Sequence, residues 1–578
     1  MDTYQTNSWE YLRQSIDAEI KSLEESILSL KHRRNALAPI SSLPTEVFGT
    51  IFSILRAPVA PSPLTPPTPS ENLDNLPWLR LSHVCHHWRE IALNQPLFWN
   101  HIHFDDVSPA GAAGMLARAK MAPLHLEARH IGHWNDAKFS VFQKEIRIHT
   151  FHISHLDISA YFPRVSDIVK GLVSPAPILE YLSLVCAGLP NDVLSESSRV
   201  CIPDALFGGI TPRLSCLKLR TCDISWKSPF LIGLRYLEID YPFANSRPSL
   251  SVWLDALNKM PQLQTLSLHM ASPVALSAPL PSSIRRTITL PSLSVFNFTA
   301  SARDCVLALA HLILPPLTRL CIVSLSDLQD GSDVQEILPY LSQHARVFES
   351  TQTMVVRSDD GIFTTMFAWS EASLHTEIPF LEEMPLVPLA FSFRAQDWSP
   401  ETHTAVFDAA LAALPLENLL SLTLQHRMNH FSKQVWLHHT QRWSLIQRLC
   451  LSYSATRGFV EMLEEDNGEC KNPLLPSLIT LVLISVQLSA RRTLSLCDVL
   501  MKRFEQGVPL EALNLKTCFA TDHAVRLLSE IVVDVLGPME TFSAWDDEAR
   551  GAAFIRGDND ENDPLADIGD AWDMDDDY

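Results

Sequence analysis

Basic residues, glycine and long apolar runs are all scarce in this sequence. Its 45 Lys and Arg are outnumbered by 66 Asp and Glu, which gives a formal net charge of −21. A surface that binds nucleic acid needs a basic stripe, and none is present, so nucleic acid is not an expected partner. The longest apolar stretch, residues 306–317, contains His311, Pro315 and Pro316 and is too short to span a bilayer. We therefore expect a soluble protein with no membrane partner.

Paired cysteines and a secretory leader are also missing. Eleven cysteines are scattered over 578 residues without a CxxC pair, a pattern typical of a reducing compartment rather than of a disulfide framework. The first ten residues are polar and lack a basic segment followed by an apolar core, so they do not predict a signal peptide. These features favour the cytoplasm or the nucleus.

Catalytic signatures that depend on glycine are absent as well. The sequence has 18 glycines and contains no GxSxG elbow, Walker-type GxxxxGK[ST] or GxGxxG, and it has no HExxH. One carboxylate cluster, residues 464–466, precedes Asn467 and Gly468 and indicates a solvated turn. We expect no catalytic residue and no cofactor, so the predicted function is binding and not catalysis.

Histidines gather at two places without the spacing of a zinc finger. Cys85 lies among three of them, and His83 and His87 could share one face of a helix, but no second ligand pair follows. His101 and His103 alternate with apolar residues, as on the edge of a strand. We assign a metal site to neither group.

An amphipathic helix is predicted at the start of the chain, in a first region of residues 1–38. Residues 7–38 contain no Gly or Pro, and Pro39 ends the helix. Six apolar residues recur at four- and three-residue steps and form a heptad seam: Ile16, Ile20, Leu23, Ile27, Leu30 and Leu37. Arg34 interrupts this seam. The helix is either a coiled coil for self-association through residues 7–38 or a helix that packs on its own chain.

A small helical module is predicted for residues 39–104. In PISSLPTEVFGTIFSIL, Ser42 or Thr45 is placed to cap a helix with one apolar face. The proline-rich insertion at residues 57–77 excludes a continuous helix. A second amphipathic helix is predicted in WLRLSHVCHHWREIAL, and PLFWNHI follows it. Two short helices and a final Trp segment are therefore expected.

The segments LPTEVFGTIFSIL, LSHVCHHWREIAL and PLFWNHI together resemble the F-box-like family, whose members share LPxE, a Trp-containing second helix and a terminal Trp motif. The resemblance implies a module that docks on the Skp-family adaptor of a cullin-based ubiquitin ligase. By position, it implies that these residues form or support the adaptor-binding surface: Leu43, Pro44, Glu46, Val47, Ile51, Val84, Trp88 and Trp99. The apolar residues alone leave open that this surface packs only on residues 105 onward.

Beyond residue 104 a repeated pattern fits LxxLxL, the core of a leucine-rich repeat. Each match predicts a short strand that buries its first, fourth and sixth residues, and neighbouring repeats complete the core. Helices are expected between the strands, and a Cys after two of the matches, Cys222 and Cys518, is expected to bond turn backbone. Residues 323–416 fit poorly, although 389–395 resembles a degenerate strand. The ten matches begin at Leu179, Leu214, Leu234, Leu263, Leu293, Leu317, Leu419, Ile446, Leu478 and Leu510.

The predicted fold class is therefore α/β. An N-terminal helix and a small all-α F-box-like module precede an irregular leucine-rich-repeat solenoid at residues 105–545, with parallel strands on the concave side and helices outside. A doubly wound α/β domain is the rival interpretation. The segment 546–578 holds 13 acidic residues and two arginines, and this charge predicts a disordered tail.

These features together predict a substrate-recognition adaptor of an SCF-type ubiquitin ligase. The F-box-like module would hold the Skp-family adaptor, the solenoid would hold a target protein, and other subunits would transfer ubiquitin. The alternative is a scaffold protein outside the ubiquitin system, in which the F-box-like helices only cap the open end of the solenoid. The sequence does not identify the target.

Overall fold

The computed structural model describes residues 2–56, 77–187, 200–240, 247–273, 286–325, 328, 330–345, 351–359, 363–369, 389–394, 398–425, 433–440, 442–464, 473–538 and 541–542. The predicted proline-rich insertion, apart from Pro77, and the predicted acidic tail lie outside these residues. The chain divides into two compact units, Met1–Thr265 and Leu266–Tyr578.

The first unit begins with helices. A long helix, α1 (Asp2–Ala36), ends before Pro39 as predicted, and Arg33 and Arg34 in its last turn complement the negative end of the helix dipole. The seam residues of α1 and Leu37 beyond it are between 47% and 84% exposed. The short elements that follow are η1 (Pro39–Ser42), α2 (Thr45–Arg56), η3 (Pro77–His83), α3 (His86–Asn94) and α4 (Pro96–Trp99).

Two local predictions in this region are wrong. Neither predicted cap, Ser42 or Thr45, occupies the position before α2: Ser42 belongs to η1, where its hydroxyl donates to the carbonyl of Pro39 at 2.7 Å, and Thr45 is the first residue of the helix. The second amphipathic segment is not one helix, because the chain is extended at Cys85, between η3 and α3. The hydroxyl of Ser82 donates to the carbonyl of Leu79 at 2.7 Å and supports the tighter turn of η3. His83 and His87 therefore belong to different helices.

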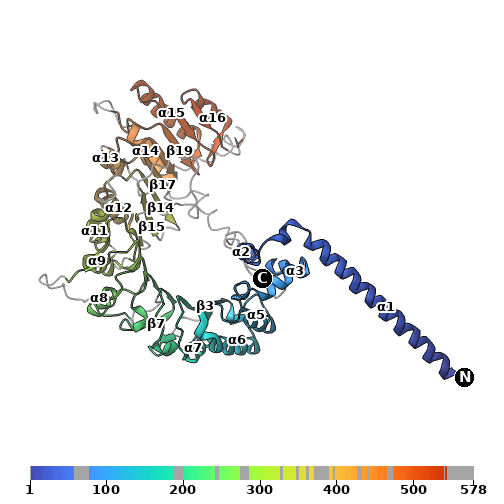
Figure 1. Ribbon diagram of the computed structural model, residues 1–578. Coiled ribbons are helices and arrows are strands. Elements are labelled where there is room, and N and C mark those ends of the chain that lie inside the picture. Colours follow the sequence, from blue (N-terminus) through green and yellow to red (C-terminus); the bar gives the residue numbers. More distant parts are fainter. Residues whose placement is uncertain are drawn as a thin grey trace. The chain divides into compact units, whose positions relative to one another are not determined.

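Parallel strands and connecting helices form the rest of the first unit. Its main sheet contains β1 (His101–His103), β2 (Leu124–Ala128), β3 (Ile153–Tyr161), β4 (Tyr181–Ala187), β6 (Cys216–Arg220) and β8 (Tyr236–Asp240), each parallel to the next. A smaller parallel pair joins β5 (Val200–Ile202) to β7 (Cys222–Ile224). The helices are α5 (Pro109–Ala119), α6 (Asp136–His149), α7 (Phe162–Gly171) and α8 (Leu250–Asn258). Figure 1 shows α5, α6 and α7 beside one another along this sheet.

Side chains alternate between the two faces of this sheet, as the period of a strand requires. One face is the core, where apolar residues pair in register across six strands and are at most 1% exposed: Ile102, Leu126, Leu156, Leu182, Leu217 and Leu237. The other face carries polar and aromatic side chains. We call this second face the strand face.

The second unit contains more strands than the first, with helices between them. Its main strands are β9 (Thr265–His269, which starts at the unit boundary), β11 (Val295–Ser301), β13 (Arg319–Leu325), β14 (Thr353–Asp359), β15 (Phe363–Trp369), β16 (Leu389–Arg394), β17 (Ser421–Gln425), β18 (Arg448–Ser452), β19 (Thr480–Ile484), β21 (Ala512–Asn514) and β23 (Asp534–Leu536). Two small sheets contain β10 (Ile288–Thr289) with β12 (Leu312–Ile313), and β20 (Gln487–Leu488) with β22 (Phe519–Thr521) and β24 (Thr541–Phe542).

Eight helices of the second unit are described. They are α9 (Ala302–His311), α10 (Ser332–Gln335), α11 (Leu338–Ala345), α12 (Pro400–Ala413), α13 (Lys433–Thr440), α14 (Tyr453–Glu464), α15 (Ala490–Glu505) and α16 (Asp522–Ser529). Several begin where a hydroxyl side chain accepts a hydrogen bond from the first turn, as Ser399 does for α12, Ser489 for α15 and Thr521 for α16.

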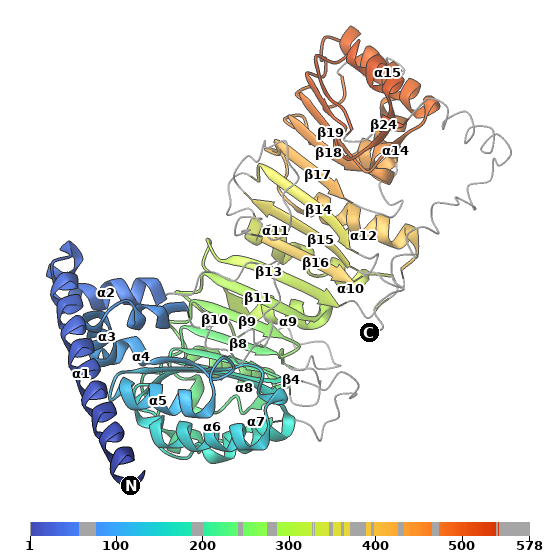
Figure 2. The ribbon, with the colours of Figure 1, turned by 90° about the vertical axis from the view of Figure 1, so that its right-hand side faces the viewer.

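One part of the second sheet departs from the predicted alternation of strand and helix. The spatial order is β13, β16, β15, β14 and β17, and β15 runs antiparallel to both of its neighbours (Figure 2). Only residues 360–362 separate β14 from β15. A link this short permits a hairpin but not a parallel crossover, which takes a dozen residues or more. This hairpin explains why residues 323–416 fit the repeat template poorly.

The predicted strands are otherwise confirmed. All ten LxxLxL segments contain a strand, nine of these strands pair in parallel with a neighbour, and 389–395 contains β16. Both cysteines bond backbone, but in the preceding strand and not in a turn: the Sγ of Cys222 donates to the carbonyl of Leu184 in β4 at 3.6 Å, and that of Cys518 to the carbonyl of Leu483 in β19 at 3.2 Å. Burial raises the pKa of both thiols, to about 11 for Cys518. They remain protonated and serve as structural groups.

Candidate docking surfaces

An aromatic cluster holds the helical module together. Phe48 and Phe52 lie one turn apart on α2 and are fully buried. Trp88 on α3 contacts both, with ring centroids 5.5 and 5.6 Å away, and Phe98 on α4 lies 5.4 Å from Phe52. Aromatic pairs at these separations add about 0.5–1.5 kcal/mol each beyond the area they bury. The cluster therefore fixes α2 against α3 and α4.

Trp99 attaches the module to the sheet that follows. Its side chain is 5% exposed, and its Nε1 donates to the carbonyl of Ala92 at 2.7 Å. The guanidinium of Arg118, on α5, lies 4.9 Å from the Trp99 ring, a cation–π contact. Trp99 therefore acts inside the module and is not available to a partner in this conformation.

The other residues implied by the F-box resemblance lie nearer the surface. Pro44, Glu46, Val47 and Val84 are exposed, and Leu43, Ile51 and Trp88 are half-buried. The carbonyl of Pro44 accepts hydrogen bonds from the backbone N–H groups of Val47 and Phe48, so the LPxE segment starts α2. Because Val47 and Ile51 are four residues apart, they share one face of this helix.

Four further apolar side chains of the helical module are exposed, and two of them continue the exposed side of α2. Ile54 and Leu55 on α2 and Leu97 on α4 are more than half exposed, and Ile40 in η1 is also exposed. The three- and four-residue steps from Val47 to Ile51, Ile54 and Leu55 were visible in the sequence, but the pattern did not reveal which of two apolar faces would be buried. We call the exposed apolar residues of α2 with Leu43, Pro44 and Val84 the α2 face.

The strand face of the first unit is a second surface. Its in-register rows contain His101, His125, His155, Tyr181, Cys216 and Tyr236, and then His103, Glu127, Asp157, Ser183, Lys218 and Glu238. The rings of His125 and His155 stack with centroids 4.0 Å apart, and the ammonium of Lys218 lies 4.9 Å from the ring of Tyr236. Most of these side chains are half-buried. The surface therefore presents aromatic rings and charges of both signs together.

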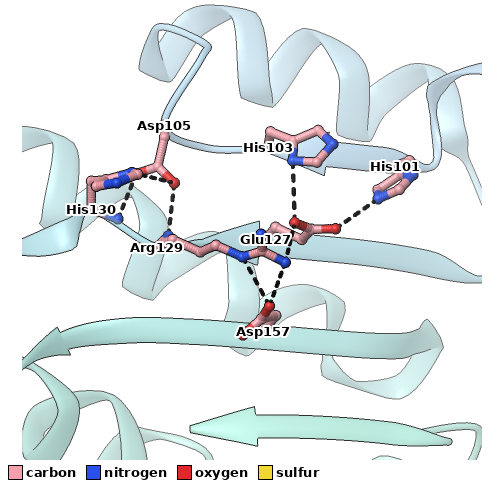
Figure 3. A network of polar contacts seen from close by, with 7 residues as sticks. All are labelled: His101, His103, Asp105, Glu127, Arg129, His130 and Asp157. Carbon is pink, nitrogen blue, oxygen red and sulfur yellow. Dashed lines mark hydrogen bonds and ion pairs between the residues drawn. The ribbon is translucent and has the colours of Figure 1, made fainter. Parts of the chain in front are cut away.

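Ion pairs order the charged end of the strand face (Figure 3). The guanidinium of Arg129 donates to Asp157 from Nε at 3.0 Å and from Nη2 at 2.9 Å, and Nη2 lies 3.1 Å from Glu127. Asp105 accepts from the backbone N–H groups of Arg129 and His130 at 2.7 and 3.0 Å. Hydrogen bonds from His101 and His103 hold the pKa of Glu127 far below its usual range. Glu127 is therefore ionised at neutral pH.

Two groups of metal-ligating side chains occur in the part of the chain that the structure describes. One comprises His101, His103 and Glu127, and the other Asp408, His438 and His439. The first group includes His101 and His103, which were correctly predicted to lie on a strand. Glu127 was missed, because only the register of β1 with β2 brings it opposite His103.

Comparison with known proteins concerns the helical module. A family model described as F-box-like matches residues 40–105, within one residue of the predicted boundaries at each end. No curated protein matches the chain. Among the described residues, no helix has both the length and the apolar character needed to cross a membrane. The module is thus F-box-like, and such a domain suggests an adaptor-type role in a ubiquitin ligase.

Proposed function

We propose that this chain is the substrate receptor of a cullin-based, SCF-type ubiquitin ligase and that it docks a Skp-family adaptor through the α2 face. The observation that carries the proposal is the two-sided construction of α2. Phe48 and Phe52 are buried in the module, whereas Val47, Ile54 and Leu55 are exposed on the same helix. An apolar patch held in place by a rigid core is suited to a protein partner.

The proposed target-binding part is a leucine-rich-repeat solenoid over residues 105–545. Support comes from the ten LxxLxL strands, the intervening helices and the cysteines that bond to the carbonyl of the preceding strand. The target would bind the strand face, where paired rings and charges offer both apolar contact and hydrogen bonds. The chain would contribute no catalytic group, since ubiquitin transfer would belong to the other subunits.

Co-purification with a Skp-family adaptor tests the proposal. Replacing Leu43→Ala together with Pro44→Ala should weaken adaptor binding at least tenfold, about 1.4 kcal/mol, when affinity is measured by calorimetry. The matched control is Val173→Ala, because Val173 is 67% exposed outside the module. Full affinity of the double variant, or a folded wild-type chain that never binds the adaptor, would refute the proposal.

The alternative, a scaffold whose F-box-like helices only cap the repeats, rests on a specific contact. Arg118 on α5 packs over Trp99, so the module covers the first helix after it. Deleting residues 2–94 leaves α4 and β1 in place and separates the two functions. An insoluble product would support the scaffold in which the F-box-like helices cap the repeats. A soluble product that still binds its target would support the substrate receptor.

Self-association is proposed as an additional property of α1. Its seam residues are exposed, and an apolar heptad seam is stabilised when a second helix covers it. A second copy of residues 7–38 has the same spacing and would supply that cover.

A further inference from the structure

Three donor atoms converge on the strand face at the spacing of a metal site. His101 and His103 lie two residues apart on β1, so their rings project to the same side, and Glu127 is the register partner of His103 on β2. The Nε2 of His101 lies 3.1 Å from Oε1 of Glu127, and the Nδ1 of His103 lies 3.4 Å from Oε2 (Figure 3). All three donor atoms fall within 4.8 Å of one another.

The two separations from histidine to Glu127, 3.1 and 3.4 Å, reach different oxygens of the carboxylate and are close to the spacing between ligands of a tetrahedral zinc ion. Zinc bonds to imidazole nitrogen and carboxylate oxygen are about 2.0–2.1 Å long, which places tetrahedral ligands about 3.3 Å apart. Two imidazoles and one carboxylate also form the donor set of catalytic and other zinc sites that leave a coordination position for water or a further ligand. To admit the ion, the two imidazoles and one carboxylate oxygen would have to turn toward a common point.

Charged side chains surround the three donors, and the donors are accessible to solvent. Glu127 supplies the carboxylate donor. The Nη2 of its neighbour Arg129 lies 3.1 Å from Oε2 of Glu127, and the same guanidinium is held by Asp157 through two hydrogen bonds. Asp105 fixes the backbone of residues 129 and 130 just beyond β2. The three donor side chains retain 27%, 38% and 22% exposure, so an ion can reach them from solvent.

The second group of candidate ligands is less suitable. His438 and His439 are adjacent on α13, and His439 is 1% exposed with its Nε2 already 2.8 Å from Asp408. His438 is 61% exposed and Asp408 31%, but an ion would have to displace the buried contact between His439 and Asp408. In the first group, by contrast, all three side chains are partly exposed, between 22% and 38%.

We propose that His101, His103 and Glu127 bind one Zn²⁺ ion on the strand face, with a fourth position available to water or to a side chain of a bound protein. The inference uses only the geometry of β1 and β2. It does not depend on adaptor docking, which involves α2.

The test is a calorimetric titration of zinc chloride into the metal-free full chain. The wild type should bind one more zinc equivalent than the double variant His101→Ala with His103→Ala. Glu127→Gln should lower the affinity for this additional zinc more than about 100-fold, which exceeds the effect typical of an outer contact. His86→Ala and His438→Ala serve as matched histidine controls and should retain it. Unchanged stoichiometry and affinity in the double variant would overturn the proposal.

A second measurement uses the wild-type chain and needs no variant. Diethyl pyrocarbonate modifies accessible imidazoles, and mass spectrometry locates the product. Zinc should protect His101 and His103 at least tenfold and leave His86, which is 54% exposed on α3, unprotected. Equal modification of His101 and His103 with and without zinc would overturn the proposal even if the variants fail to fold.

Discussion

The indole N–H of Trp99 donates to the main-chain carbonyl of Ala92 at 2.7 Å and joins α4 to the last turn of α3. The bond is buried, so neither group can turn to water if the other is removed. The last Trp of the F-box-like pattern thereby stabilises the helices that present the α2 face.

Trp99→Phe should loosen these two helices. Phenylalanine fills most of the same space but has no N–H, and the loss of a buried hydrogen bond should cost about 1–3 kcal/mol. Hydrogen–deuterium exchange should show faster exchange across residues 86–99. Trp9→Phe is the control, because Trp9 is 73% exposed on α1, and equal exchange in the two variants would contradict the assignment.

Gly331→Ala should destabilise the second unit more than Gly507→Ala. Both glycines have positive φ, +63° and +77°, and an alanine in either place is strained by about 1–2 kcal/mol. At Gly331 the new Cβ would also lie 2.5 Å from Cγ2 of the fully buried Val406, whereas nothing lies within 4 Å at Gly507. Overpacking of this kind adds about 1–3 kcal/mol. Thermal unfolding of both variants measures the difference, and equal melting temperatures would exclude the clash.

His344 should make the second unit sensitive to acid. Burial lowers the pKa of this imidazole below the ordinary 6.5, although its hydrogen bond with the carbonyl of Thr318 opposes the shift. The unfolded chain therefore takes up the proton first, and the contribution of a neutral His344 to stability is present above about pH 6.5 and is lost as pH falls through the lowered pKa.

Denaturant unfolding at several pH values tests this sign. His344→Gln should reduce the loss of stability below pH 6.5, and the exposed residue His523, replaced by Gln, is the control. A larger loss in His344→Gln than in the wild type would show that the sign is wrong.

Ile27→Asp should dissociate any dimer formed through α1, because it places a carboxylate in the apolar seam. The neighbouring substitution Leu28→Asp changes charge equally at a side chain that is also about half exposed, at 53%, but lies off the seam. Sedimentation velocity should show a lower mass for Ile27→Asp alone. Identical masses for the two variants would argue against a dimer through the seam.

Periodic patterns allowed much of this fold to be predicted. A leucine at the first, fourth and sixth position of a segment can be buried only by a strand among similar strands, so β6, β8 and β19 followed from sequence. The hairpin of β14 and β15 did not, because its strands are rich in β-branched and aromatic residues without the leucine spacing. The break at Cys85 was also missed, since the apolar period continues across it.

The candidate sites were predictable to different extents. The LPxE motif and the two tryptophans could be recognised from short segments of sequence. The alternation of His101 and His103 with apolar residues correctly indicated a strand. Glu127 lies in a separate segment, and its position opposite His103 depends on the register between two strands, which no local pattern specifies. The exposure of Ile54 and Leu55 depended on which face of α2 the aromatic cluster would bury.

The reversed strand β15 also affects the order in which the second unit can be assembled. During synthesis, β13 emerges well before β16, its neighbour in the sheet. The strands β14 and β15 emerge between them, so their hairpin either forms first or stays unpaired until β16 is made. An edge of β13 therefore stays unpaired on the nascent chain, and an unpaired edge is a site for aggregation. Pairing between such distant segments is slow because the loop must close first. Folding of the second unit should therefore depend on protection of the growing chain at this junction.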